Sequence, residues 1–425
     1  MSEKSKSAPD FIDALQKSRQ QQSFGEYIEN YINRVKSGDI GSLPIIIGLI
    51  VIALIFQSQN ANYLTPRNLV NLIVQASIFT TIGYGIVLVL LLGEIDLSAG
   101  YTAGVSAVIV GRLLERPLDL SSFGIADPVI VPWFVAMGVA LLVTLLIGLL
   151  QGSIISGFQL PSFIVTLAGQ LAWSGVVLLM MGGAGTVNIR NETVLGVTRS
   201  FFPPAWGWLL GFLLVATLAL NEFLSYRSRA KMGLSTKPPQ AIILQMVILS
   251  AVTFAFIAVA NQDRGVPFIG LIVLLMMAVL TYVATQTRFG RYIFAVGGNK
   301  EAARRAGIRV EAIRIRVFML CSLMAGFGGI ILASRLGSVA PDAGGGQLLL
   351  NSIAAPVIGG TSLYGGSGKV SSAFFGALVI ASVDNGMFLL GLGAGQRLIL
   401  TAIVLIVAVV VDAVARRRQQ ASGRR

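Results

Sequence analysis

The stretch NLVNLIVQASIFTTIGYGIVLVLL, residues 68–91, contains no charged side chain. An α-helix needs about 20 apolar residues to cross the hydrocarbon core of a bilayer, so this stretch is long enough to span one. The whole chain has the same character, because 55% of its 425 residues are hydrophobic and only 12% are charged. Soluble domains carry about 25% charged residues. The composition therefore predicts an all-α, polytopic helical membrane protein.

Apolar segments recur along the whole chain and predict about 10–12 transmembrane helices. The first and third segments are short for a full crossing, and either could be tilted, re-entrant or extended by its flanks. The predicted segments are 43–57, 67–92, 98–113, 130–150, 160–181, 204–222, 240–260, 266–286, 312–334, 346–364, 370–390 and 394–413.

The basic residues predict the orientation of the chain. The net charge of +13 is not spread over one face, as binding to nucleic acid would require, but gathers in two tails and two loops. Short segments rich in Lys and Arg stay in the cytoplasm, and acidic lipid head groups favour the same arrangement. We therefore expect both termini in the cytoplasm and no nucleic acid partner. The four basic groups lie within residues 4–36, 227–237, 288–309 and 416–425.

Three parts are predicted along the chain. Residues 1–42 form a polar cytoplasmic tail with an amphipathic helix around Phe24–Val35. We expect no cleavable signal peptide there, because no apolar stretch follows a short basic start. Residues 43–413 form the transmembrane domain, which includes a cytoplasmic loop at about 287–312. Residues 414–425 form a basic cytoplasmic tail.

Several kinds of chemistry are not supported by the residues present. The chain has no histidine and a single cysteine, Cys321, which excludes histidine-based catalysis, histidine metal sites and a disulfide within the chain. Gly365–Lys369 looks like part of a phosphate-binding loop, but Leu363 stands where its first glycine is needed and Val370 replaces the Ser or Thr that follows the lysine. We therefore expect no catalytic residue, no metal site and no ATP site in this chain.

A short exposed helix is predicted in the basic loop. An asparagine can cap its first turn and a glutamate lies near its positive end. Two alanines favour helix, and a glycine can end it. Its small residues would fit a groove on another protein and its arginines would pair with acidic groups there, whereas the alternative is a solvated loop that only fixes the topology. The residues concerned are Asn299, Glu301, Ala302, Ala303, Arg304, Arg305 and Gly307.

Two carboxylates lie beside a predicted span. Glu94 and Asp96 occur in the stretch GEIDLS, and a charge in this position is costly unless it is solvated, paired or functional. One interpretation is a solvated turn that caps the next helix through Asp96 or Ser98, and the other is a structured element near a transport path. Residues 93–100 also align weakly with 359–366, and transporters are often built from two related halves.

Four stretches, in this order and spacing, resemble the permeases of ATP-binding-cassette (ABC) importers. Residues 301–307 resemble the "EAA…G" coupling loop of these permeases, and the RFGR and GGN sequences before it are similar to the ribose/xylose group. IDLS at 95–98, PSFIVTL at 161–167 and AAPVIGGTSLYGGSG at 354–368 are similar to further motifs of that group. The insertion around 190–262, about two segments long, resembles the xylose-type branch.

The resemblance implies a type II ABC importer-like permease in the bacterial inner membrane that provides the path for a monosaccharide, a pentose such as xylose. It implies a second permease copy, a periplasmic sugar-binding protein and one or more ATP-binding subunits, which hold ATP and Mg and dock onto the short helix. No cofactor is implied in this chain. The expected path residues are Glu94, Asp96, Ser98, Gln170, Asn351, Thr361 and Ser362.

Polar residues inside the predicted spans have two interpretations. They can line the sugar route, or they can form hydrogen bonds between helices. These residues are Gln75, Gln151, Gln170, Gln245, Asn351, Asp384 and Asn385.

Two other functions compete with the importer. A secondary transporter driven by protons or sodium would suit twelve spans and a pseudo-repeat, and Asp384 is the residue of interest for it. A membrane-embedded enzyme would need a cluster of acid, base or metal-binding residues, and the sequence offers none.

Overall fold

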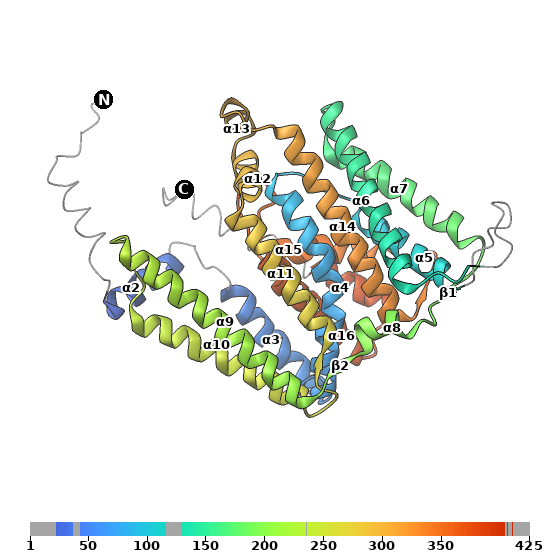
Figure 1. The fold of residues 1–425 in the computed structure, drawn as a ribbon. Helices are drawn as coiled ribbons and strands as arrows, with labels where there is room; N and C mark the ends of the chain where they lie inside the picture. Colours follow the sequence, from blue (N-terminus) through green and yellow to red (C-terminus); the bar gives the residue numbers. More distant parts are fainter. Residues whose placement is uncertain are drawn as a thin grey trace. The chain divides into compact units, whose positions relative to one another are not determined.

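The computed structural model describes residues 23–36, 43–115, 129–234, 236–403, 406 and 410. These residues are mostly helical, which confirms the all-α prediction (Figure 1). The helices are α2 (Phe24–Lys36), α3 (Leu43–Gln59), α4 (Pro66–Leu91), α5 (Ala99–Glu115), α6 (Trp133–Gly157), α7 (Ser162–Met181), α8 (Glu192–Arg199), α9 (Pro204–Lys231), α10 (Pro239–Ala260), α11 (Phe268–Gln286), α12 (Arg288–Gly298), α13 (Lys300–Arg305), α14 (Val310–Leu336), α15 (Gln347–Ile358) and α16 (Ser371–Leu389). Residues 394–403 are also helical.

The strands are short and join loops. β1 (Val187–Asn188) pairs antiparallel with β4 (Ser338–Val339), with Val187 opposite Val339. β2 (Phe201–Phe202) pairs with β3 (Val266–Pro267).

The predicted segments each contain a helix that begins close to the predicted start. Within the described residues, eight helices are long and apolar enough to cross a membrane, and two shorter apolar helices lie at Pro44–Gln59 and Gln347–Ile358. The segment predicted at 346–364 was too long, because α15 ends before Gly359 and Gly360, and Gly360 has a φ of +93°. Residues 1–22 and 37–42 of the predicted N-terminal tail, the predicted C-terminal tail at 414–425 and part of the last segment lie outside the described residues.

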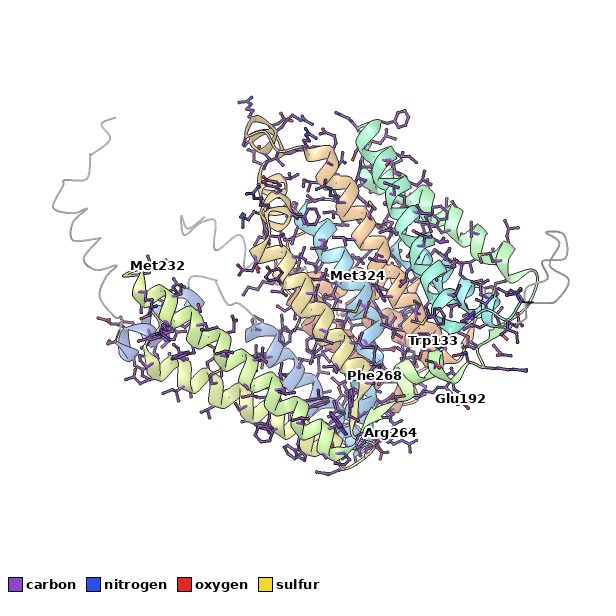
Figure 2. The ribbon with its side chains drawn as sticks, in the orientation of Figure 1. Trp133, Glu192, Met232, Arg264, Phe268 and Met324 are labelled. Carbon is purple, nitrogen blue, oxygen red and sulfur yellow. The ribbon has the colours of Figure 1, made fainter. Side chains whose placement is uncertain are left out.

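The chain divides into two compact units, and the larger contains α3 to α8 and α11 to α16. Its centre is formed by α4 and α14, the two candidate spans with the largest buried share. α14 packs against α4, α5 and α6, and its residue Met324 lies in this interior (Figure 2). The core of this unit therefore surrounds the helix that begins just after the predicted coupling loop.

Two glycines on α6 let that helix approach α14 closely. A Cβ atom at Gly148 would lie 2.7 Å from the Cα of Met319, and one at Gly152 would lie 2.8 Å from the Cα of Ile315. Residues four apart share one face of a helix, and small residues at this spacing allow transmembrane helices to pack backbone to backbone.

We therefore expect Gly152→Val to lower the stability of the folded chain by about 1–3 kcal/mol, because the added atoms overpack this contact. Gly138→Val is the matched control, since Gly138 lies on the same helix and a Cβ there meets nothing within 4 Å. The thermal unfolding midpoint in detergent should fall for the first variant only, and equal midpoints would contradict the packing.

The smaller unit contains α2, α9 and α10. α9 and α10 form a hairpin in which Gly211 packs against Ile257 and Phe254. At the connecting end, the ammonium of Lys237 pairs with the carboxylate of Glu222 at 2.8 Å. Both helices are apolar enough to be candidate membrane spans, and few of their residues are buried. The insertion predicted around 190–262 therefore contains two apolar helices, as expected.

Candidate functional site

The predicted short helix exists as α13 and is capped as expected. The side-chain oxygen of Asn299 accepts a hydrogen bond from the backbone N–H of Ala302 at 2.9 Å. α13 ends at Arg305, and Gly307 follows with a φ of +81°, which favours glycine. Ala303 is buried against the core, whereas the Glu301 side chain is 67% exposed. Ala302, Arg304 and Arg305 are also exposed. The outer face of α13 is therefore free to meet another protein.

The last turn of α12 meets the loops after α4 and α15 through the backbone. The N–H of Gly366 donates to the carbonyl of Leu91 at 2.9 Å. A Cβ at Gly365 would lie 2.8 Å from the carbonyl oxygen of Gly297 and 2.9 Å from the nitrogen of Gly93. We call this meeting point the glycine junction, and it consists of Leu91, Gly93, Gly297, Gly365 and Gly366. It joins the last turn of α12 to the loops that follow α4 and α15.

The glycine junction also brings together the two stretches that align weakly in the sequence. A Cβ at Gly93 would lie 3.3 Å from the carbonyl oxygen of Tyr364. The start of residues 93–100 thus lies against Tyr364 and Gly365, near the end of 359–366, and Gly297 in the last turn of α12 lies against Gly365 as well. The spacing of the motifs along the chain does not predict this contact.

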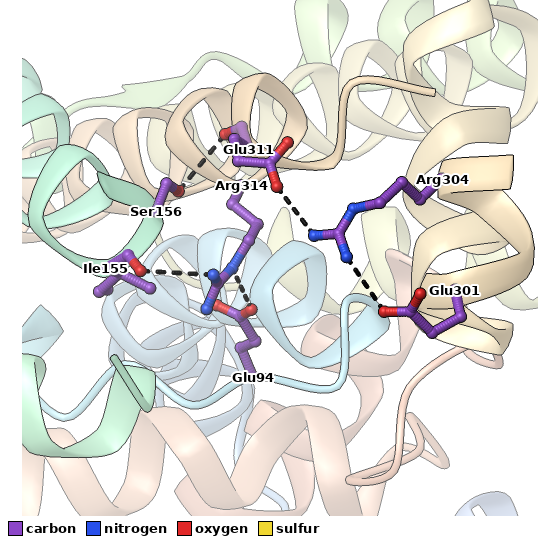
Figure 3. A network of polar contacts seen from close by, with 7 residues as sticks. All are labelled: Glu94, Ile155, Ser156, Glu301, Arg304, Glu311 and Arg314. Carbon is purple, nitrogen blue, oxygen red and sulfur yellow. Dashed lines mark hydrogen bonds and ion pairs between the residues drawn. The ribbon is translucent and has the colours of Figure 1, made fainter. Parts of the chain in front are cut away.

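A set of charged groups lies beside the junction (Figure 3). Arg304 of α13 pairs with Glu301 at 3.1 Å and with Glu311 of α14 at 2.9 Å. One turn further along α14, the guanidinium of Arg314 forms an ion pair with Glu94 and donates to the carbonyl of Ile155 at 3.4 Å. The start of α14 is therefore tied to α13 on one side, and to α6 and the loop after α4 on the other.

The Glu94–Arg314 ion pair is buried. The Glu94 side chain is 13% exposed and the Arg314 side chain 7% exposed. Burial raises the pKa of Glu94, while Arg314 and, more weakly, Lys300 of α13 act against that rise. Sequence reasoning missed Arg314 as a functional residue, although a charged side chain inside a predicted span was a usable signal.

Asp96 and Ser98 are fully buried, so the prediction that this turn is solvated was wrong, although Asp96 does accept backbone hydrogen bonds at the start of α5, as a capping residue would. The carboxylate of Asp96 accepts hydrogen bonds from the hydroxyl of Ser98 at 2.6 Å and from its N–H at 2.8 Å. The same hydroxyl lies 3.0 Å from the side-chain oxygen of Gln151 on α6. Burial raises the pKa of Asp96, and hydrogen bonds from Ser98, Cys321 and Ala99 oppose this. The loop after α4 is therefore held by polar contacts to its neighbours.

The remaining candidate path residues are distributed among three places. Thr361 and Ser362 are buried in the loop after α15, near the glycine junction. Gln170 is partly exposed on α7. Asn351 is buried on α15 and lines a cavity of about 90 Å³ between α15, α16 and residues 398–402. The structure thus brings Glu94, Asp96 and Ser98 together but leaves Gln170 and Asn351 on other elements.

Besides Gln151, two further polar residues inside the predicted spans take part in contacts between elements. Asn385 of α16 accepts a hydrogen bond at 2.8 Å from the buried Asn68 at the start of α4. Asp384 lies 3.5 Å from Arg397. Both contacts agree with a packing role for these two side chains.

Comparisons with known proteins agree with the family resemblance that the motifs indicate. A family model described as "Branched-chain amino acid transport system / permease component" matches residues 68–409. The xylose transport system permease protein XylH of Escherichia coli (strain K12) is 35% identical over 90% of this chain and 94% of its own length. XylH of Haemophilus influenzae is 33% identical over 89% of this chain and 98% of its own length. The ribose import permease protein RbsC of E. coli (strain K12) is 30% identical over 86% and 92%. No solved structure matches with comparable significance.

Proposed function

We propose a function from one premise: this chain belongs to the branched-chain amino acid transport system / permease component family, whose model matches most of its length. On that premise the chain is the membrane-spanning permease subunit of an ATP-driven importer. It is a multi-pass protein of the bacterial inner membrane and performs no covalent chemistry. A separate ATP-binding subunit holds ATP and Mg and hydrolyses the ATP.

The proposed substrate is a monosaccharide, with xylose as the first sugar to test. The relatives are named for xylose transport and ribose import, and the identity to E. coli XylH is higher than that to RbsC. The insertion that carries α9 and α10 supports the same choice, because it resembles the xylose-type branch.

The observation that carries the proposal is that α13, with its exposed face, directly follows α12, whose last turn lies in the glycine junction. The exposed side chains of Glu301, Arg304 and Arg305 form the docking surface for the ATP-binding subunit. Closure of that subunit displaces α13, and the backbone contacts of Gly297 pass the displacement to the loops after α4 and α15. The membrane domain then changes the side to which its path is open, as a shift between two populated states.

The orientation and the remaining partners follow from the same assignment. The basic groups support a cytoplasmic position for both termini and for the segment with α12 and α13. A second copy of this chain completes the path, and a periplasmic binding protein delivers the sugar from the opposite side. The proposed path residues are Glu94, Asp96, Ser98, Gln170, Asn351, Thr361 and Ser362.

The test is ATP hydrolysis by liposomes that contain this chain, its ATP-binding subunit and its binding protein. We expect one pentose from a panel of pentoses and hexoses to stimulate hydrolysis and to accumulate in the liposomes, but only when all three proteins are present. Omitting each protein in turn is the control. Sugar uptake by this chain alone, driven by a proton or sodium gradient, would instead support a secondary transporter.

A further inference from the structure

The amphipathic helix predicted near the N-terminus is confirmed as α2, and the transport mechanism above gives it no role. Its apolar residues recur three or four positions apart and gather on one side. Ile28 and Ile32, one helical turn apart, are 41% and 45% exposed. The apolar residues with described side chains are Phe24, Tyr27, Ile28 and Ile32, and the polar ones are Glu26, Glu29 and Asn33.

The place of α2 within the smaller unit indicates what covers these isoleucines. α2 contacts α10, and it lies beside the end of the hairpin at which α9 ends and α10 begins (Figure 1). That end is basic, with Arg227, Arg229 and Lys231 on α9, whereas Trp206 and Trp208 lie at the start of α9. Aromatic residues at one end and basic residues at the other are typical of a hairpin that crosses a bilayer.

The length of α9 places the basic end at the membrane surface. Its 28 residues extend about 42 Å at about 1.5 Å per residue, whereas the hydrocarbon core is about 30 Å thick. The last turns of α9 therefore lie at the level of the lipid head groups. α2, which is beside them, lies at the same level.

The covalent chain keeps α2 close to the start of an apolar helix. Only residues 37–42 separate the end of α2 from the start of the apolar helix α3. A chain extends at most about 3.3–3.6 Å per residue, so this connection spans no more than about 25 Å. An exposed apolar face that cannot move far from the bilayer is in reach of lipid at all times.

We propose that α2 lies parallel to the membrane, with Ile28 and Ile32 inserted between lipid acyl chains at the basic end of the hairpin. Helices that have one apolar face and one charged face, and that are not apolar all round, bind in the plane of the membrane surface in this way. Glu26, Glu29 and Asn33 remain in contact with water. This inference does not depend on the identity of the transported sugar.

The experiment uses the full-length chain in nanodiscs of phosphatidylethanolamine and phosphatidylglycerol. Cysteine is introduced by Ile28→Cys and Ile32→Cys on the apolar side, and by Glu29→Cys and Asn33→Cys as matched controls on the polar side. Each variant is labelled with a small fluorophore. The native cysteine, Cys321, has no exposed surface, and labelling of the unchanged chain gives the blank.

We expect quenchers attached to lipid tails to reduce the fluorescence at positions 28 and 32 several-fold more than at 29 and 33, and iodide in the water to show the reverse order. Equal quenching by iodide at all four positions would overturn the proposal. Protection of positions 28 and 32 only after addition of the ATP-binding subunit would also overturn it, because the apolar side would then be a protein contact.

Discussion

The Gly297→Ala variant is expected to lose most sugar uptake and sugar-stimulated ATP hydrolysis. A Cβ at Gly297 would collide with the carbonyl oxygen of Leu91 and would lie 2.8 Å from the nitrogen of Gly366. These two atoms form the 2.9 Å hydrogen bond that joins the loops after α4 and α15. Overpacking of this kind costs about 1–3 kcal/mol, and each 1.4 kcal/mol is about a factor of ten in an equilibrium. We therefore expect a loss of about fivefold to about a hundredfold.

The neighbouring residue provides the control for this prediction. A Cβ at Gly298 meets nothing within 4 Å, so Gly298→Ala makes the same chemical change one position away without touching the glycine junction. Uptake and ATP hydrolysis are measured in liposomes, together with binding of the ATP-binding subunit to each variant. Equal activity of the two variants would show that the glycine junction does not transmit the movement of α13. Retained binding by Gly297→Ala with lost stimulation would place the defect in transmission rather than in docking.

The helices could be predicted from the sequence because the signal for each is local. A span needs a run of apolar residues, and the run at 68–91 contains that signal in full. The same holds for α13, whose cap by Asn299 and end at Gly307 involve residues only a few positions apart. α15 was predicted too long because apolar residues around Gly359 and Gly360 continue the hydropathy signal after the backbone has left the helix.

The candidate site was only partly predictable because its contacts join distant residues. Gly297, Leu91 and Gly366 were each visible in the sequence, but nothing in their spacing shows that they meet. The weak alignment of 93–100 with 359–366 was a hint that these loops are related, not that they touch. The environment of Asp96 was likewise open, since a carboxylate beside a span can be solvated or buried. The carboxylate of Asp96 is held by a hydrogen bond from Ser98, whose hydroxyl lies close to Gln151 of a different helix.

Arg314→Met is expected to destabilise the chain strongly, because it leaves the carboxylate of Glu94 buried without its partner. The two side chains are only 7% and 13% exposed, and removal of one partner of a buried ion pair typically costs about 3–5 kcal/mol. The exposed residue Arg316, two positions along the same helix, supplies the control variant Arg316→Met. Thermal unfolding midpoints in detergent should fall for Arg314→Met and stay near the wild-type value for Arg316→Met.

The double variant Arg314→Met/Glu94→Gln separates the ion pair from simple packing. With no charge left to bury, it should recover much of the stability lost in Arg314→Met. An equally low midpoint in both variants would mean that the arginine acts through its packing alone.

Acidification provides an independent check on the same pair. Burial raises the pKa of Glu94, and Arg314 is the main group that opposes this rise, so Arg314→Met raises the pKa further above its unfolded value. The protonated carboxyl then adds stability that is fully present below the unfolded pKa and is lost as the pH rises through the folded pKa. The midpoint of Arg314→Met should therefore approach that of the wild type as the pH falls, whereas the double variant, which has no carboxylate at position 94, should show no such convergence. A pH-independent difference between Arg314→Met and the wild type would show that Glu94 is not the group left unpaired, and that the loop after α4 is held to α14 by other contacts.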